Sequence, residues 1–302
     1  MKPTVTIGVC VRNCELFIKE AIDSIMAQDY PHNQIRLVFV DDGSEDRTLS
    51  IIKDCVQRID VPTVILHTSW KGLGNARNAV VAKSEGDYIL WVDGDMVLSR
   101  VFLRKLVEFM EKNPQTGIVK GKQALLPGRN LLATLELYSR AAGRMVDYQS
   151  QKGQFKVVGT GGALYRIKAV SQVGGFDPNL RGYNEDWDVE LRMRKAGWAL
   201  NTVDVIFYDY ERYGLTWVSL WRRYWLRGYH THYFLHKNEG MIKHYRMFPP
   251  AASLAGLLSS FSLFKLTRQK AVFLMALPSA FKMTAWYMGF IRSHLDSYAP
   301  KS

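Results

Sequence analysis

The sequence has few cysteines, and they form no recognisable ligand set or crosslink pattern. Only Cys10, Cys14 and Cys55 occur among the 302 residues. Their spacing matches no metal-binding arrangement, and an odd number leaves one thiol unpaired in any disulfide scheme. We therefore expect a reduced, cytoplasmic compartment. Because Met1 leads within a few residues into a β-rich segment, no signal peptide is predicted.

Acidic residues are scarce in the last third of the sequence. From Glu211 to Ser302 there are 13 Lys or Arg and 3 Asp or Glu, a net charge of +10 out of +12 for the whole chain. This asymmetry predicts a nearly neutral catalytic domain over residues 1–210 and a basic tail over residues 211–302. The tail is also aromatic and apolar, which favours a membrane surface with anionic lipid as its partner and disfavours nucleic acid.

The apolar stretches of the tail are all interrupted. Phe248–Phe264 has 17 residues and opens with two prolines, whereas Ala271–Ile291 has 21 residues but contains Pro278 and Lys282. A membrane-spanning helix needs about 20 apolar residues, and a charge at the bilayer centre is costly. We therefore favour helices that lie in the cytoplasmic leaflet over a two-span hairpin, with a soluble helical cap as the third alternative.

The first 210 residues alternate between β-rich and helix-periodic segments joined by short loops. Strands are expected at 4–11, 35–40, 63–67, 88–92, 117–123, 161–166 and 199–208. Helices are expected at 15–27, from a cap at Ser44 or Asp46 to about 58, and at 74–84, 100–112, 131–146 and 185–196. This alternation predicts an α/β fold, Rossmann-like, with a mainly parallel central sheet and helices on both faces, followed by a helical, apolar extension.

Polar motifs follow these strands or open these helices. The most informative is Asp93-Gly94-Asp95, directly after the buried run 88–92. Ligands of open α/β sheets bind at the carboxyl ends of the strands, and paired carboxylates there suit Mg²⁺ or Mn²⁺. Alone, the motif is as typical of a solvated turn as of a metal site. The other four motifs are Val9–Asn13, Asp41–Ser44, Lys71–Asn78, and Gly174–Asp177 with Asn184–Asp188.

In this order and spacing, the five motifs resemble those of family 2 glycosyltransferases, which have the GT-A fold. The resemblance covers residues 4–210. It implies an inverting, metal-dependent enzyme that moves a sugar from a nucleotide-diphosphate donor to a hydroxyl or phosphate acceptor. The basic tail favours a lipid-linked saccharide or polyprenyl phosphate as acceptor. The alternatives are a soluble saccharide or protein acceptor, and a nucleotide-sugar-binding protein without turnover.

The resemblance also implies roles for individual residues. Asp95, with Asp93, would hold Mn²⁺ or Mg²⁺ against the donor diphosphate. Asp186 would be the catalytic base that deprotonates the acceptor. Asp41 or Asp42 is similar to the nucleoside-binding acid of the family. The remaining donor-binding residues that we expect are Asn13, Gly72, Arg77 and Glu185.

Several of these residues also have simpler interpretations. Asp186 is typical of a first-turn helix acid, and Arg77 of a surface residue. Asp188 and Glu190 lie four residues before Arg192 and Arg194, which predicts ion pairs on a helix surface. His232 and His236 share a helical face without the partners of a metal site, so interfacial or acceptor-binding roles are favoured.

The tail departs from the family at one motif. Family members often carry Gln-x-x-Arg-Trp over the donor, whereas this chain has Trp221-Arg222-Arg223-Tyr224-Trp225, in which only the final Trp matches. This departure argues against a processive polysaccharide synthase. It leaves Arg222, Arg223 and Arg227 as candidate contacts for a phosphate of the donor or of a lipid-linked acceptor, or for anionic lipid headgroups.

Overall fold

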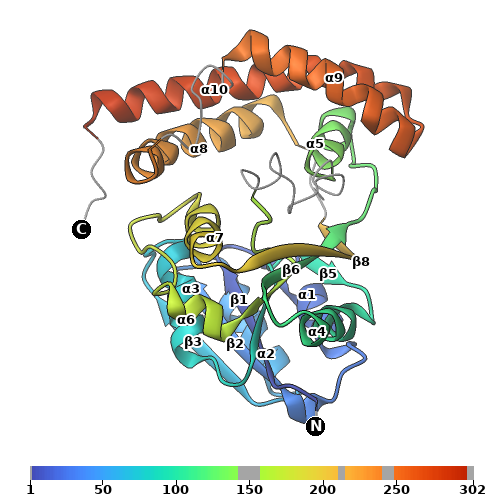
Figure 1. Ribbon diagram of the computed structural model, residues 1–302, viewed down its shortest axis with the longest axis vertical. Helices are drawn as coiled ribbons and strands as arrows, with labels where there is room; N and C mark the ends of the chain where they lie inside the picture. Colours follow the sequence, from blue (N-terminus) through green and yellow to red (C-terminus); the bar gives the residue numbers. More distant parts are fainter. Residues whose placement is uncertain (1, 142–156, 210–214, 240–247, 298–302) are drawn as a thin grey trace. The chain divides into compact units, whose positions relative to one another are not determined.

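The computed structural model describes residues 2–141, 157–209, 215–239 and 248–297 (Figure 1). The chain forms two compact units. The first comprises residues 1–124, 147–181 and 185–209, and the second comprises 125–146, 182–184 and 210–302. The second unit thus includes two segments that the sequence-based division at residue 210 assigns to the catalytic domain. The boundary at residue 210 itself lies outside the described residues.

One mixed sheet forms the centre of the first unit. Its order is β3-β2-β1-β4-β7-β6-β8-β5. The half β3-β2-β1-β4 is parallel, whereas β7 pairs antiparallel with β4 and β6, and β5 pairs antiparallel with β8. The strands are β1 Val5–Val11, β2 Ile35–Asp42, β3 Thr63–Thr68, β4 Tyr88–Trp91, β5 Met96–Leu98, β6 Thr116–Gln123, β7 Ala163–Arg166 and β8 Ala199–Asp209.

Helices cover both faces of this sheet, as expected for parallel strands that are largely buried, here β1, β2 and β4. Val5, Ile7 and Val9 of β1 belong to one core with helices α1, α2 and α4. Gly8 points to the opposite face, where a Cβ would lie 2.6 Å from Cγ1 of Val80 in α3. The helices of this unit are α1 Ile18–Met26, α2 Thr48–Val56, α3 Leu73–Lys83, α4 Phe102–Lys112, α6 Ile167–Gln172 and α7 Glu185–Lys195, with a 3-10 turn η1 at His32–Gln34.

The second unit is helical (Figure 1). Helices α8 and α10 pack with their backbones almost in contact: a Cβ on Gly228 would lie 1.9 Å from the carbonyl oxygen of Trp286, and one on Gly289 would lie 2.0 Å from that of Trp225. The elements are α5 Leu131–Ala141, α8 Trp217–Lys237, α9 Pro249–Thr267, a 3-10 turn η5 Lys270–Met275 and α10 Ala276–Leu295. Residues 142–146 of the helix predicted over 131–146 lie outside the described residues.

A buried ion pair neutralises Lys282 within the second unit. Its Nζ donates to Oε2 of Glu136 at 2.8 Å, and the hydroxyl of Tyr224 donates to Oε1 at 3.0 Å. Burial alone would raise the pKa of Glu136, but the charges of Lys282 and Arg140 lower it to about 2. The lysine in the middle of the 271–291 stretch therefore forms an ion pair with a carboxylate of α5.

The two apolar stretches of the tail become α9 and the pair η5–α10. The second stretch changes from a 3-10 turn to an α-helix at Ala276, and Pro278 lies in the first turn of α10. In the described parts of the chain, we find no helix with both the length and the apolar character needed to cross a bilayer.

Candidate active site

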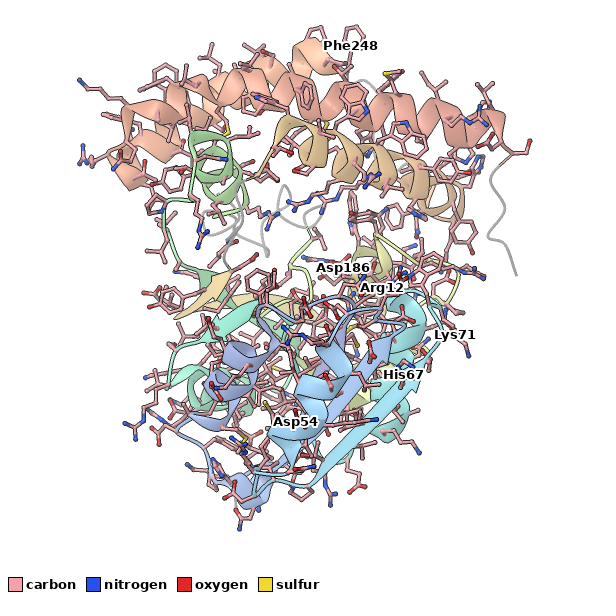
Figure 2. The ribbon with its side chains drawn as sticks, turned by 180° about the vertical axis from the view of Figure 1, so that it is seen from behind. Arg12, Asp54, His67, Lys71, Asp186 and Phe248 are labelled. Carbon is pink, nitrogen blue, oxygen red and sulfur yellow. The ribbon has the colours of Figure 1, made fainter. Side chains whose placement is uncertain are left out.

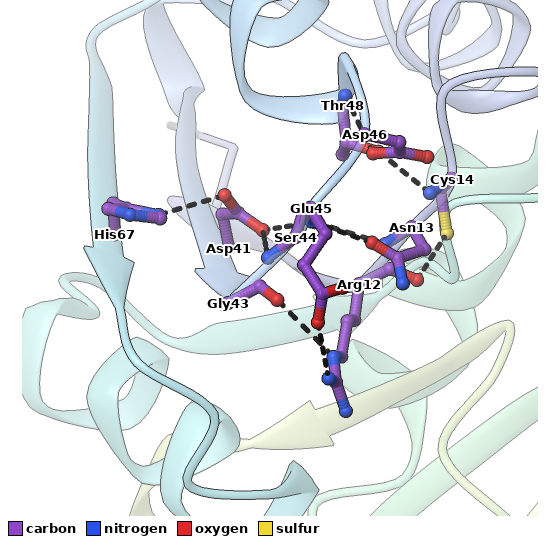
Figure 3. A network of polar contacts seen from close by, with 10 residues as sticks. All are labelled: Arg12, Asn13, Cys14, Asp41, Gly43, Ser44, Glu45, Asp46, Thr48 and His67. Atoms are coloured by element: carbon purple, nitrogen blue, oxygen red, sulfur yellow. Dashed lines mark hydrogen bonds and ion pairs between the residues drawn. The ribbon is translucent and has the colours of Figure 1, made fainter.

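The loops after β1 and β2 are joined by a network of polar contacts (Figure 3). The side-chain oxygen of Asn13 accepts a hydrogen bond from the backbone of Glu45 at 2.8 Å, and the Asn13 N–H donates to Ser44 Oγ at 3.0 Å. Asn13 has a φ of 54°, a left-handed conformation that asparagine tolerates better than most residues. The predicted donor-binding residue Asn13 therefore lies at the carboxyl edge of the sheet, where it fixes two loops.

Asp41 and Asp42 are buried at the end of β2, and both carboxylates have partners. Asp41 accepts hydrogen bonds from the backbone and hydroxyl groups of Ser44, and its other oxygen lies 2.9 Å from Nδ1 of His67. Asp42 accepts from the backbone N–H groups of Lys71 at 2.7 Å and Gly72 at 2.8 Å. Both acids thus shape the loops of this edge. Their contact with a nucleoside stays a prediction.

Gly72 opens helix α3 where no other residue would fit. Its φ is 91°, and a Cβ there would lie 2.4 Å from the carbonyl oxygen of Arg181. A glycine is needed for both reasons, since side chains disfavour this φ and the backbone at 181 leaves no room. Gly72 therefore brings the end of the 174–181 segment against the start of α3.

Arg77 is buried and paired, so its interpretation as a surface residue is wrong. Its guanidinium donates to Oε1 of Glu185 and lies over the rings of Trp91 and Phe176, with centroid distances of 5.9 and 5.7 Å. Within the described residues, Oε2 of Glu185 is buried without a hydrogen-bond partner. Two of the predicted donor-binding residues thus form one ion pair, which ties α3 to the first turn of α7 and holds Asp186 next to it.

Asp93 lies in a concentration of negative charge at the end of β4. Burial raises its pKa, and the carboxylates of Asp209 and Asp186 add to this effect, whereas Arg77 and Lys120 oppose it. Its side chain points at the backbone of Gly161, where a Cβ would lie 2.5 Å from Oδ2. Asp93 and Asp186, from motifs more than 90 residues apart, are therefore electrostatic neighbours.

Asp186 stands in the first turn of α7 (Figure 2). Its Oδ1 accepts from the backbone N–H of Trp187 at 2.8 Å. A Cβ on Gly159 would lie 3.5 Å from Oδ2 of Asp186 and 3.2 Å from Nζ of Lys120, so the glycine backbone brings these two side chains together. One carboxylate oxygen of Asp186 is thus held by the first turn of the helix, which fixes the direction of the group, as a positioned base requires.

Lys120 and Glu190 are parts of this site that the sequence analysis missed or misassigned. Burial lowers the pKa of Lys120, against the charges of Glu190, Asp93, Asp186 and Asp209, and its Nζ donates to the carbonyl of Val158 at 2.8 Å. Glu190 accepts from the backbone N–H groups of Val158 and Gly159 at 2.7 and 2.6 Å. Its pKa is raised to about 8, first by burial and then by Asp186.

The interpretation of Asp188 and Glu190 as helix-surface acids is therefore wrong, because their exposed fractions are 0% and 1%. The predicted pairing of Asp188 with Arg192 does occur, with Nη2 at 2.7 Å from Oδ2. The one sequence signal for Lys120 was a lysine directly after the apolar pair Ile118 and Val119 of β6.

The side chains at the Asp93–Asp95 motif fit a divalent cation that completes its coordination with substrate. Asp93 has the carboxylates of Asp209 and Asp186 as electrostatic neighbours beside Arg77 and Lys120. Asp95 adds a second carboxylate to the motif and contributes, after burial, to raising the pKa of Cys14 to about 11. In the described part of the chain, no group of three His, Cys, Asp or Glu side chains forms a ready metal cage. Mg²⁺ and Mn²⁺ sites built on one or two carboxylates and substrate phosphates need no such cage.

Comparison with known proteins agrees with this fold. Residues 6–174, more than half of the chain, match the family model described as Glycosyl transferase family 2. The chain therefore belongs to glycosyltransferase family 2. Within that family, 113 residues are 37% identical to the uncharacterized glycosyltransferase EpsJ of Bacillus subtilis, over 37% of this chain and 32% of EpsJ.

A second relative acts on a phosphate-containing polymer. Over 101 residues, the chain is 31% identical to the poly(ribitol-phosphate) beta-N-acetylglucosaminyltransferase TarS of Staphylococcus aureus. The matched region covers 33% of this chain and 18% of TarS. The matched regions thus span a third or less of these two relatives. The crystal structure of TarS residues 1–349 with UDP-GlcNAc is similar over 99% of this chain and 93% of that chain, with a TM-score of 0.55 and 16% identity.

A third protein has a similar GT-A-like fold. The mannosyltransferase PcManGT of Pyrobaculum calidifontis, solved with GDP-Man and Mn²⁺, matches 99% of this chain and 89% of its own, with a TM-score of 0.69 and 17% identity. At this identity the likeness establishes the fold. The predicted α/β class, with a helical region after the catalytic fold, is confirmed.

Proposed function

We propose that this chain is an inverting, metal-dependent transferase that moves a hexose-type sugar from a nucleotide-diphosphate donor to a lipid-linked saccharide or polyprenyl phosphate at the cytoplasmic face of a membrane. The observation that carries the catalytic part is the neighbourhood of Asp93, Asp186 and Lys120 at one edge of the sheet. It combines a cation-binding carboxylate with a base, as glycosyl transfer to a hydroxyl requires.

Asp186 would act on the acceptor. As the acceptor oxygen forms its bond to the anomeric carbon, the carboxylate takes the hydroxyl proton, and the carbon–oxygen bond to the donor phosphate breaks with its electron pair on the departing nucleoside diphosphate. A single displacement inverts the anomeric centre. A phosphate acceptor attacks as an anion and needs no base, so this role of Asp186 applies to a hydroxyl acceptor.

Asp93 and Asp95 would act at the leaving group. A bound Mn²⁺ or Mg²⁺ would supply positive charge where the diphosphate gains negative charge. The loops fixed by Asn13, Asp41, Asp42 and Gly72 would enclose the nucleoside end. Arg77 would hold Glu185, and so the start of α7, in the position from which Asp186 faces the acceptor.

The membrane part of the proposal is supported by the surface of the helical unit. Phe248 lies at the start of α9 with 54% of its surface exposed (Figure 2). The exposed Lys265 lies in the last turn of this helix, and the exposed Arg268 and Lys270 follow it. Apolar side chains beside cationic ones are typical of helices that lie in a lipid surface. The other large exposed apolar residues of these helices are Leu254, Leu257, Leu258, Phe261, Leu266, Phe273, Leu274, Leu277, Met288, Ile291 and Leu295.

A donor screen tests the catalytic part. We expect slow release of nucleoside diphosphate from one donor in a panel that includes UDP-GlcNAc and GDP-mannose, with Mn²⁺ or Mg²⁺ present, and its loss when EDTA is added. Hydrolysis that is indifferent to EDTA would remove the metal from the proposal. No turnover or binding of any donor would remove the transferase.

Vesicle flotation tests the membrane part. The full chain is expected to float with vesicles that contain anionic lipid, and less with purely zwitterionic ones, because each basic residue near such a surface contributes about 1 kcal/mol. Phe261→Asp should reduce flotation severalfold, since it places a charge among the exposed apolar side chains of α9. Leu16→Asp, a similarly exposed leucine of the first unit, is the control. A chain that stays unbound in every mixture contradicts the membrane assignment.

A further inference from the structure

The short loop 182–184, which leads into the candidate base, is held by one turn of α8 within the second unit. A Cβ on Gly182 would lie 3.1 Å from Nε2 of His230. The ring of Tyr183 lies 6.2 Å from that of His230, and Nδ2 of Asn184 donates to the hydroxyl of Thr231 at 3.0 Å. Three consecutive residues thus contact residues 230 and 231 of the helix.

Arg227, one turn earlier on α8, is an exposed guanidinium held between two aromatic rings. It lies 5.3 Å from the ring centroid of Tyr183 and 5.3 Å from that of Tyr224. Among the described residues, no carboxylate pairs with it, in contrast to Arg292 of α10, which pairs with Asp296 at 3.0 Å. Stacking restrains a guanidinium while leaving its N–H edge available for a bidentate oxyanion.

Tyr183, the residue on which Arg227 stacks, is close to Asp186 in the chain. Tyr183 precedes Asp186 by three residues, and an extended chain spans at most about 3.6 Å per residue. The Cα atoms of Tyr183 and Asp186 therefore lie within about 11 Å of each other, whatever the loop conformation. The residue on which Arg227 stacks is thus tied to the candidate base by three peptide units.

We propose that Arg227, stacked on Tyr183, binds a phosphate group of the acceptor. The inference rests on the proposed function and deepens it, because it names the chemical group by which the acceptor is recognised. A phosphate ester matches the fork of the guanidinium, and the net charge of +10 over residues 211–302 attracts anions to this unit. The same group occurs in a prenyl phosphate and in a soluble polyol-phosphate polymer.

Binding of farnesyl phosphate and farnesol to the full chain tests the site. The two probes share one hydrocarbon tail, so the ratio of their dissociation constants, measured by calorimetry or tryptophan fluorescence, isolates the phosphate. We expect the phosphate ester to bind about tenfold to hundredfold more tightly, as for a charged hydrogen-bonded pair. Arg227→Ala should bring the ratio near one. Arg227→Lys should give an intermediate ratio, because an ammonium retains the charge but not the fork.

Arg222→Ala is the matched control, because it removes the same charge from the same helix at an exposed position without a stacking contact. It should retain the ratio of the unmodified chain. Equal binding of the two probes by the unmodified chain, or a ratio unchanged in Arg227→Ala, would overturn the site. A circular dichroism melt of each variant verifies that it is folded.

A competition arm separates the two sources of phosphate. If a water-soluble poly(glycerol phosphate) displaces farnesyl phosphate at comparable phosphate concentration, the site serves a soluble polymer; if it does not, the site serves a lipid. Metal-dependent donor hydrolysis is measured on the same preparations. If the donor is hydrolysed but farnesyl phosphate and farnesol bind equally, only the acceptor site is wrong. If farnesyl phosphate binds more tightly but no donor is hydrolysed, the proposed function is wrong and the anion site is retained.

Discussion

Replacing Asp186 with Asn is expected to lower the rate of sugar transfer by about 10²- to 10⁴-fold, the usual contribution of a positioned base. The amide keeps an oxygen that can accept from the N–H of Trp187, so the first turn of α7 should be preserved. What the variant loses is the ability to take a proton. Donor binding, measured by calorimetry with Mn²⁺, should be nearly unchanged.

Two further variants serve as comparisons for Asp186→Asn. Asp186→Glu retains a carboxylate and should recover part of the rate if the group acts as a base. Asp54→Asn removes an exposed carboxylate from α2 and should have no effect (Figure 2). If Asp186→Asn abolishes donor binding as well as transfer, the residue holds the site together and the assignment as base fails.

Asp95→Ala is expected to remove the metal dependence of donor binding. The ion would lose one of two carboxylates, and Asp93 would be left with Asp209 and Asp186 as neighbours that disfavour its charged form. We expect donor affinity in saturating Mn²⁺ to fall at least tenfold, to the level that the unmodified chain shows in EDTA. Titration of the donor with and without Mn²⁺ measures both values.

Asp54→Ala serves as the control for nonspecific charge effects on the donor. An Asp95→Ala variant that still binds the donor more tightly with Mn²⁺ than without it would show that the ion is held elsewhere. A variant that binds the donor normally in both conditions, yet transfers nothing, would place Asp95 in catalysis and outside donor binding.

The elements of the first unit were predictable because their signals are local. The apolar runs of β1, β2 and β4 and the period of α4 gave their positions to within a few residues. The three-residue β5 and the six-residue α6 were missed, since such short elements have too few residues for a period. Of the two expected caps, Asp46 does accept from the N–H of Thr48, whereas Ser44 turns back to Asp41.

The surroundings of the site were less predictable, because they depend on contacts between distant residues. Glu190 looked like a surface acid in its own helix, yet it is buried against Val158 and Gly159. Similarly, Lys282 looked like an isolated charge in an apolar stretch, because its partner Glu136 lies 146 residues earlier. The family resemblance predicted a common site for residues from distant motifs. It did not predict which of them, such as Arg77 and Glu185, would be partners of each other.

The two glycines between α8 and α10 have a mechanical consequence. Where backbone meets backbone at Gly228 and Gly289, there is no layer of side chains to change rotamer and absorb a displacement. The two helices are therefore expected to move together as one rigid body. A displacement of α10 would therefore displace α8 as well. Because Asn184 donates to Thr231 of α8, the loop 182–184 that precedes Asp186 would follow this displacement. Binding at the surface of α10 is in this way coupled to the position of that loop.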